Sequence, residues 1–313
     1  MQKLVTQWES TEPNPDEKML KQEWQQEIDS LEHSVKMESE AASAKRSGIS
    51  ILLESANIKK EMIENRLKAD REASDKSRTS ALKTISKPII DIEALHKQDL
   101  DMAKATAEKM KTSGNPFWQG YIWNASYGGY WKEFEGEREE IPGVSLDVAH
   151  NRFDPRAQAY GEGWFDSDYS RIHAYLAFRI TPPSFGHLQI IVRPWLHGFY
   201  SLYSNDNWYK KENAAADMDT WVDLYQNFWR SRQYVDRFNM SGSELHPERS
   251  GRIDMQAVQT FFTNVGEKDL ITIRVGVKLK CRGKASSGRA SLDFSTGGAN
   301  YVYVPYVYWY LHH

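Results

Sequence analysis

The sequence has a single cysteine, and it has very little glycine and few aromatic residues in its first third. Cys281 has no possible partner within the chain, so a fold held by internal disulfides is excluded. With 313 residues, the chain is long enough to bury a core without such cross-links. We therefore expect a protein that folds under reducing conditions.

Signals for secretion and membrane insertion are also missing. Residues 1–18 lack the basic start, apolar centre and small-residue cleavage site of a signal peptide. No apolar run approaches the roughly 18 residues of a membrane-spanning helix. We expect cytoplasmic synthesis without a signal peptide and no integral membrane segment, and the sequence leaves the final location of the protein open.

Charge and motifs exclude several classes of function. The 40 Lys and Arg residues nearly balance the 43 Asp and Glu residues, so no overall attraction to nucleic acid is expected. Phosphate-binding glycine loops and the G-x-S-x-G nucleophile motif are absent, and the histidines lack metal-site spacing. We expect no cofactor, no metal and no catalytic residue that the sequence can name. A glycosidase needs only two carboxylates that are close in space, so an enzyme stays open as an alternative.

Two pairs of aspartates have a spacing that suits a hard cation. They are Asp166 with Asp168, and Asp217 with Asp219. Neither pair belongs to an EF-hand loop, and aspartates in turns usually bond to their own backbone. We therefore favour a structural role for both pairs.

Aromatic residues divide the chain into two kinds of structure. Only Trp8 and Trp24 precede Phe117, and every other Phe, Trp and Tyr follows. Glycine has the same distribution, since only Gly48 precedes Gly114. We predict a multidomain α+β protein: a flexible N-terminal segment (1–18), a helical arm (19–113) and an aromatic-rich domain (117–313).

The arm carries an apolar stripe at helical spacing. Its steps of three and four place the apolar residues on one face of a helix. This pattern predicts a coiled-coil-like arm for self-assembly, through Leu20, Trp24, Ile28, Leu31, Val35, Ile49, Leu52, Ile63 and Leu67. The polar segment 69–80 is either a weak helix or a hinge. A second helix is predicted to start before or at Pro88 and to end at residues 113–116, with Ile89, Ile92 and either Leu95 or His96 on its buried side. A hairpin, a long rod and a disordered extension all stay open.

The domain from Phe117 onward has the period-two pattern of antiparallel β-strands. Apolar and polar residues alternate most clearly at 271–280, which predicts a strand with one buried face and one solvent-exposed face. Similar patterns predict strands at 172–180, 188–193, 198–203, 257–263, 290–294 and 301–310. Many short strands indicate a mainly antiparallel β-sandwich, similar to a jelly roll. Residues 218–238 have helical spacing and predict a helix between strands.

The uncharged run 301–311 needs cover, because an exposed edge of this composition would aggregate. Pro305 cannot donate a ladder hydrogen bond, so the strand is predicted to be bulged or at an edge. Its cover is either another subunit or the arm, or else the strand is buried within its own sandwich.

A dense aromatic segment, 118–131, is the candidate binding site. Exposed aromatic rings on a β scaffold stack on sugar faces or partner surfaces. The candidate residues are Trp118, Trp123, Tyr127, Tyr130 and Trp131, with Tyr121 between them. The alternative is that these rings are core residues.

These patterns favour a non-enzymatic structural or attachment protein. Its arm would self-assemble or dock into a larger assembly, and its β head would bind a partner or glycan. The first alternative is a carbohydrate-active enzyme or lectin-like module. The second is a pore-forming toxin, which the thin apolar stripe of the arm disfavours.

Overall fold

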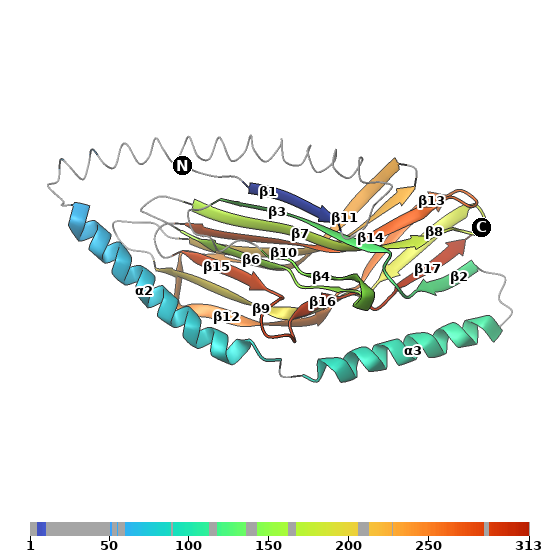
Figure 1. The fold of residues 1–313 in the computed structure, drawn as a ribbon, viewed down its shortest axis with the longest axis horizontal. Helices are drawn as coiled ribbons and strands as arrows, with labels where there is room; N and C mark the ends of the chain where they lie inside the picture. The colour runs from blue at the N-terminus through green and yellow to red at the C-terminus, as the bar shows by residue number, and fades with distance from the viewer. Residues whose placement is uncertain are drawn as a thin grey trace.

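The computed structural model of the protein describes residues 5–10, 51, 55, 60–88, 90–112, 118–135, 143–161, 167–205, 213–226, 228–284 and 288–312. Antiparallel strands dominate these residues and form three sheets, and two helices lie outside the sheets (Figure 1). None of the described helices is long and apolar enough to span a membrane.

The first layer is a six-stranded sheet in which every neighbouring pair is antiparallel. Its strands, in spatial order, are β1 (Val5–Ser10), β3 (Tyr127–Glu135), β7 (Ser167–Ile180), β14 (Ile271–Lys284), β10 (Asn213–Gln226) and β11 (Phe228–Gly242).

The second layer is a seven-stranded sheet, and a four-stranded sheet contributes side chains to the same core. The seven strands are β4 (Leu146–Asp147), β5 (Arg152–Phe153), β16 (Tyr301–Tyr303), β9 (Trp195–Asn205), β15 (Arg289–Asp293), β6 (Arg156–Tyr160) and β12 (Glu244–Gln256), which pairs with β9. A short 3-10 helix, η1 (Val148–His150), connects β4 to β5. The four strands are β13 (Gln259–Val265), β8 (Gly186–Val192), β17 (Val307–His312) and β2 (Trp118–Ile122).

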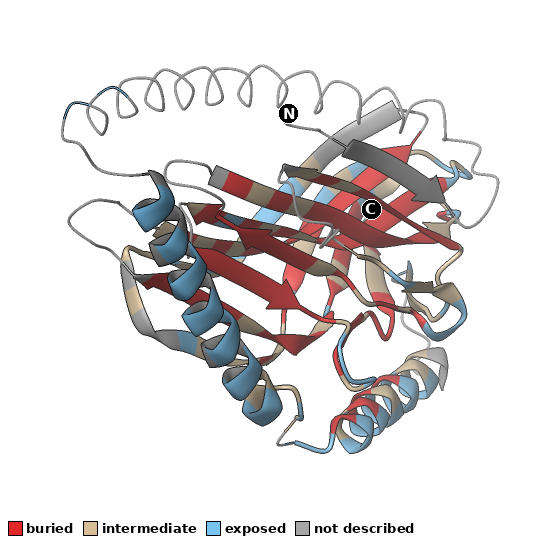
Figure 2. Cartoon of the chain, turned by 60° about the vertical axis from the view of Figure 1, so that its left-hand side comes forward, coloured by how far each residue is buried: buried red, intermediate tan, exposed pale blue. Residues whose placement is uncertain are grey.

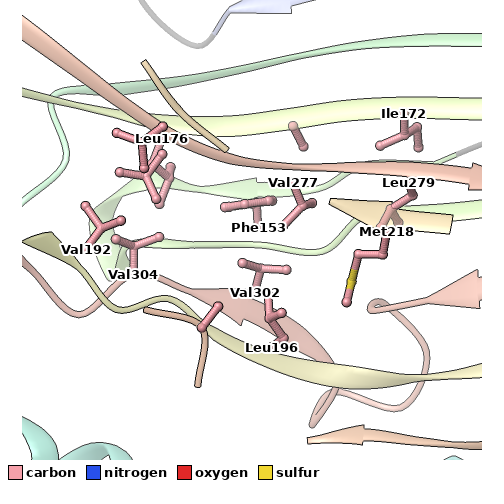
Figure 3. Close-up of a cluster of buried hydrophobic side chains, with 14 of the residues drawn as sticks. Phe153, Ile172, Leu176, Val192, Leu196, Met218, Val277, Leu279, Val302 and Val304 are labelled. Atoms are coloured by element: carbon pink, nitrogen blue, oxygen red, sulfur yellow. The ribbon is translucent and has the colours of Figure 1, made fainter. Parts of the chain in front are cut away.

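The hydrophobic core lies between the layers. Figure 3 shows Ile172 and Leu176 of β7 with Val277 and Leu279 of β14 on one side, and Val302 among the residues of the other. The register pairs Ile172 with Leu279 and Leu176 with Val275, so the inward residues of adjacent strands lie side by side. Period-two alternation therefore builds one continuous apolar surface on each layer. The prediction of a mainly antiparallel, sandwich-like domain is confirmed at this level.

The prediction that the strand at 271–280, which is part of β14, has a solvent-exposed face is wrong. Its inward residues are buried as expected, but Thr272 and Arg274 on the opposite face are only 3% and 2% exposed. Those side chains lie in a second packed layer on the outer face of the six-stranded sheet. Alternation of polar and apolar residues identified the strand but not the solvent exposure of its polar face.

The predicted helix at residues 218–238 is also wrong. This segment forms β10 and β11, which pair as antiparallel neighbours. Residues from Thr220 to Gln226 are all buried, on both faces of β10. Because both faces are packed, large residues occur at odd and even positions, and the resulting spacing resembles that of a helix.

Pro305 divides the C-terminal run into two strands that belong to different sheets. β16 precedes it in the seven-stranded sheet, and β17 follows it in the four-stranded sheet, between β8 and β2. β17 is therefore neither an edge strand nor a bulged continuation of β16. The cover that the sequence required is supplied by strands of the same chain.

Two helices, α2 (Lys60–Ile85) and α3 (Ile92–Thr112), lie on the side of the seven-stranded sheet (Figure 1). α2 runs without a break through the polar segment 69–80, so this segment is helix and not a hinge. Asp91 caps α3 by accepting a hydrogen bond from the backbone N–H of Ala94 at 3.0 Å. The predicted burial of Ile92 is confirmed, and of the two alternatives beside it His96 is the buried one.

Much of the predicted arm lies outside the described residues. This applies to Leu20, Trp24, Ile28, Leu31, Val35, Ile49, Leu52 and Ile89, and to the predicted boundary at Gly114–Pro116. Ile63 and Leu67 lie in α2, but their side chains are outside the description. The coiled-coil-like arm is thus not confirmed. Within the predicted flexible segment, Val5–Ser10 instead forms β1, which pairs with β3.

Candidate functional site

The structure divides the predicted aromatic cluster among three environments. Trp118 and Trp123 belong to β2 and the residue that follows it, in the four-stranded sheet. Tyr127 and Trp131 point to the outer face of the six-stranded sheet, where they are 2% and 6% exposed. Tyr130 alternates with them and packs into the core. The single binding cluster predicted from the sequence is therefore not formed.

A smaller group of rings remains accessible on the outer face of the four-stranded sheet. We call Tyr121, Trp123, Tyr308 and Tyr310 the aromatic platform; each is half-buried. The rings of Tyr121 and Trp123 are stacked, with centroids 5.0 Å apart and planes at 13°. Tyr308 lies directly opposite Tyr121 in the register, with centroids 5.0 Å apart. The antiparallel pairing of β2 and β17 thus gathers rings from distant parts of the chain.

Polar side chains surround the platform. Gln119 and Gln189 flank Tyr310 on the two neighbouring strands. The Tyr308 hydroxyl donates a hydrogen bond to Gln119 Oε1 at 2.8 Å. Further along the same face, His187 stacks on the exposed ring of Phe262 with centroids 5.8 Å apart. Flat rings bordered by amides and imidazoles offer both stacking and hydrogen bonds to a ligand.

The phenols of Tyr121 and Tyr308 stay neutral at physiological pH. Burial raises the pKa of Tyr121 and of Tyr308 above the ordinary value. Burial, together with the negative charge of Asp99, raises the pKa of the neighbouring Tyr306 to about 12. These hydroxyls can therefore donate and accept hydrogen bonds but carry no charge.

Tyr306 packs against the platform and is hydrogen-bonded to Asp99 of α3. Tyr306 is 5% exposed and meets Tyr121 and Trp123 edge-on, at centroid distances of 5.2 and 5.7 Å. Its hydroxyl donates to Asp99 Oδ1 at 3.3 Å, while Trp195 Nε1 donates to Asp99 Oδ2 at 3.1 Å. Asp99 therefore links α3 to Tyr306, which borders the platform.

The outer face of the six-stranded sheet carries a buried aromatic layer, which we define as Trp131, His173, Tyr175 and Trp221. Trp131 stacks on His173 with centroids 4.1 Å apart and planes at 17°. A Cβ at Gly276 would lie 2.5 Å from both the Trp221 ring and the Ala174 carbonyl oxygen, so only glycine gives this ring room to lie against the sheet. All four rings are at most 6% exposed. This layer is a packing element and does not present rings to a ligand.

A buried charge cluster adjoins this layer. Arg274 donates two hydrogen bonds to Asp223, at 2.7 and 2.6 Å, and Arg232 Nε donates a third at 3.0 Å. Asp223 is fully buried, and Arg274 is 2% exposed. Paired, hydrogen-bonded charges of this kind are tolerated in a packed interior.

Asp217 and Asp219 belong to no metal-binding group in the described part of the chain. Asp217 and Asp219 lie opposite Lys280 and Lys278 on β14. Burial raises the pKa of both carboxyl groups, and the lysines oppose this effect. Within the described parts of the chain, no group of His, Cys, Asp or Glu side chains could hold a metal ion. Asp166 lies outside the description.

Tyr308 and Tyr310 are the site residues that the sequence interpretation missed. Their segment was treated only as a strand in need of cover. The signal was present, because Tyr306, Tyr308 and Tyr310 alternate with Val307, Trp309 and Leu311. Period two places all three tyrosines on one side of the chain.

Comparison with known proteins adds little. No protein-family model and no curated protein matches the chain. Among solved structures, it is similar to a family 35 carbohydrate binding module from Clostridium thermocellum (11% identity over 61% of this chain and 97% of the module, TM-score 0.22). It is also similar to the Eiger TNF of S. frugiperda (9% identity, 44% and 90% coverage, TM-score 0.18) and to the module TmCBM61 in complex with β-1,4-galactotriose (9%, 62% and 92%, TM-score 0.14). TM-scores this low carry no argument about function, so the site must be interpreted from its own geometry.

Proposed function

We propose that the protein is a non-enzymatic attachment protein whose β-sandwich binds glycans on the aromatic platform. One observation carries the proposal: the Tyr121–Trp123 pair presents stacked, half-buried rings on a sheet face bordered by Gln119 and Gln189. The C–H face of a pyranose ring packs on such rings, while its hydroxyls bond to the amides.

Neutral chemistry suits this role. Tyr121 and Tyr308 are neutral phenols whose pKa burial raises further, so they present uncharged hydroxyls to an uncharged sugar. Asp99, the carboxylate beneath the platform, accepts hydrogen bonds from Trp195, Gln256 and Tyr306. A carboxylate engaged in this way supports the rings above it and is poorly placed to transfer protons to a substrate.

Replacing Trp123 with alanine tests the proposal. We expect Trp123→Ala to weaken glycan binding by about fivefold or more, because it removes one half of the stacked pair, and stacking of this kind contributes about 1 kcal/mol or more. Glycan microarrays would identify the ligand, with cellohexaose as a first flat-faced probe, and isothermal titration calorimetry would measure the loss.

The control is Phe185→Ala, which removes an exposed ring outside the platform. Phe185 is 69% exposed and lies in the bend that precedes β8. This variant should retain binding and stability. If Trp123→Ala bound glycan as well as the unmodified protein, the platform would not be the site. If no glycan bound the unmodified chain, the glycan function would be refuted.

We also propose, from the apolar stripe of the sequence, that residues 19–113 mediate self-assembly. Multi-angle light scattering on the full chain should give a mass above that of a monomer, because an amphipathic helix buries its stripe best against a second copy. Substituting Ile28 and Leu31 together with glutamate should return the mass to the monomer value. A monomeric unmodified chain would contradict self-assembly.

A further inference from the structure

A buried chain of four hydrogen-bonded side chains connects α3 to the sandwich. The Nε2 atoms of His96 on α3 and His197 on β9 lie 3.0 Å apart. His197 Nδ1 lies 3.1 Å from Asp254 Oδ1 on β12, and the Tyr301 hydroxyl lies 3.5 Å from His96 Nδ1. His96 is 9% exposed and His197 is fully buried. We call the His96–His197 contact the histidine latch.

The chemistry of the partners assigns the protons along this chain. The Asp254 carboxylate can only accept, so His197 Nδ1 carries a hydrogen, and the Nε2 of neutral His197 is an acceptor. His96 must then donate from Nε2, which leaves its Nδ1 to accept from Tyr301. Every member is satisfied while both histidines are neutral. Protonation of His197 at Nε2 would leave two N–H groups facing each other at 3.0 Å, and protonation of His96 at Nδ1 would remove the acceptor of the Tyr301 hydroxyl hydrogen.

Other charged groups around the latch disfavour its protonation. Arg152 lies over the Tyr301 ring, with its guanidinium carbon 4.1 Å from the ring centroid, and Arg252 donates to Asp254 at 2.6 Å. Burial, then His197 and Arg152, lower the pKa of His96 to about 4. Burial also lowers the pKa of His197, although Asp254 opposes the shift. The titratable and charged groups around the latch are Glu93 and Asp99 of α3, Arg152 of β5 with the nearby Asp154, Arg252 and Asp254 of β12, and Tyr301 and Tyr303 of β16.

α3 depends strongly on this contact. The residues of α3 that are buried in the described structure are Ile92, His96, Asp99 and Ala103, which form one stripe at steps of four, three and four. The remaining faces of α3 are largely exposed (Figure 2). Two of these four buried side chains, His96 and Asp99, are therefore ionisable. Burial of the two apolar side chains alone contributes little free energy to holding α3 on the sandwich.

We propose that the histidine latch is an acid-sensitive switch that holds α3 on the sandwich when both imidazoles are neutral and releases it when they are protonated. Asp99 follows His96 by one helical turn and holds Tyr306, which supports Tyr121 and Trp123. Release of α3 therefore loosens the aromatic platform. This second step rests on the proposed glycan-binding function, whereas the release itself does not.

The sign of the pH dependence follows from proton binding. A released His96 titrates near its ordinary pKa of 6.5 and a docked one near about 4, so the released state binds more protons between these values. Docking is complete above pH 6.5 and weakens as pH falls toward 4. At pH 5 the docking equilibrium should be weaker than at pH 8 by roughly tenfold or more.

Spin labels on α3 and on the sandwich would measure release directly. Met102 on α3 and Val258 before β13 are 57% and 51% exposed, so Met102→Cys with Val258→Cys provides two labelling sites. Cys281 is fully buried, and burial raises the pKa of its thiol, so it resists labelling. Double electron–electron resonance on the full chain should give one narrow distance at pH 7.5 and a broad second population at pH 5.

Two variants separate the latch from general acid effects. His96→Gln keeps a donor for His197 but does not titrate, and it should retain the narrow distance at pH 5. His150→Gln removes an exposed histidine that pairs with Asp147, and it should release α3 as the unmodified chain does. An unchanged distance from pH 7.5 to 4.5, or equal release in His96→Gln, would overturn the proposal.

A binding titration with cellohexaose, or with the array-selected glycan, tests the coupling separately. Weaker binding at pH 5 than at pH 7.5, restored by His96→Gln, is the expected result. Release of α3 without any glycan binding at either pH would refute the proposed function and leave the switch intact. Glycan binding that does not change while α3 is released would refute the coupling.

Discussion

Replacing Asp223 with alanine is expected to lower the free energy of unfolding by about 3–5 kcal/mol, the cost typical of breaking a buried ion pair. Asp223 is fully buried and accepts three hydrogen bonds from Arg274 and Arg232. In the alanine variant, the guanidinium groups of Arg274, which is buried, and Arg232, which is half-buried, lose the negative charge of this carboxylate. Urea denaturation monitored by circular dichroism would measure the loss.

A double-mutant cycle provides the control for this prediction. Asp223→Ala combined with Arg274→Ala should destabilise the protein by less than the sum of the two single variants, because the second substitution removes a charge that the first left uncompensated. Asp223→Asn keeps the shape and an acceptor oxygen, and should cost less than Asp223→Ala. Strict additivity would show that the cluster does not act as a unit.

Replacing Trp131 with alanine is expected to cost a comparable amount, about 3–5 kcal/mol, because it removes a large buried side chain. The ring is 6% exposed and stacks on His173 at a centroid distance of 4.1 Å. Trp131 was a candidate ligand contact in the sequence interpretation, so the variant also tests the correction made by the structure. The folded protein should bind glycan with unchanged affinity.

The Trp123→Ala and Trp131→Ala variants are therefore expected to have opposite effects on glycan binding and on stability. Trp123→Ala should lose binding with little change in stability, since its ring is half-buried at the surface. Trp131→Ala should lose stability with no change in binding, and Trp131→Phe should recover part of that stability. Loss of binding in a folded Trp131→Ala protein would place the outer face of the six-stranded sheet in the site.

Local patterns identified much of the fold correctly. The strands at 172–180, 188–193 and 271–280 were predicted because apolar residues alternate there with period two. A helix boundary near Pro88 was also indicated, because proline disfavours a helix interior, although α3 begins after this residue, at Ile92, and not before or at it. These features depend on a few neighbouring residues, so they can be inferred without knowing what packs against them.

Predictions about exposure were less successful. Residues 218–238 were assigned to a helix because β10 is packed on both faces, and period two disappears when both faces carry large residues. The polar face of β14 was expected to be wet, although Arg274 is buried against Asp223, a partner 51 residues away. The packing on both faces of β10 and the pairing of Arg274 with Asp223 both depend on residues distant in the sequence, so no local pattern indicates them.

The sequence by itself determined that the chain has an aromatic, strand-rich region from Phe117 onward and that its run of C-terminal tyrosines lies along one side of a strand. Only the tertiary structure decided which rings face solvent. Trp123 and Trp131 are chemically identical and eight residues apart, yet one joins the platform and the other packs on His173. The physical reason is that exposure is set by the sheet to which a strand belongs and by what covers that face, and both depend on pairing between distant segments.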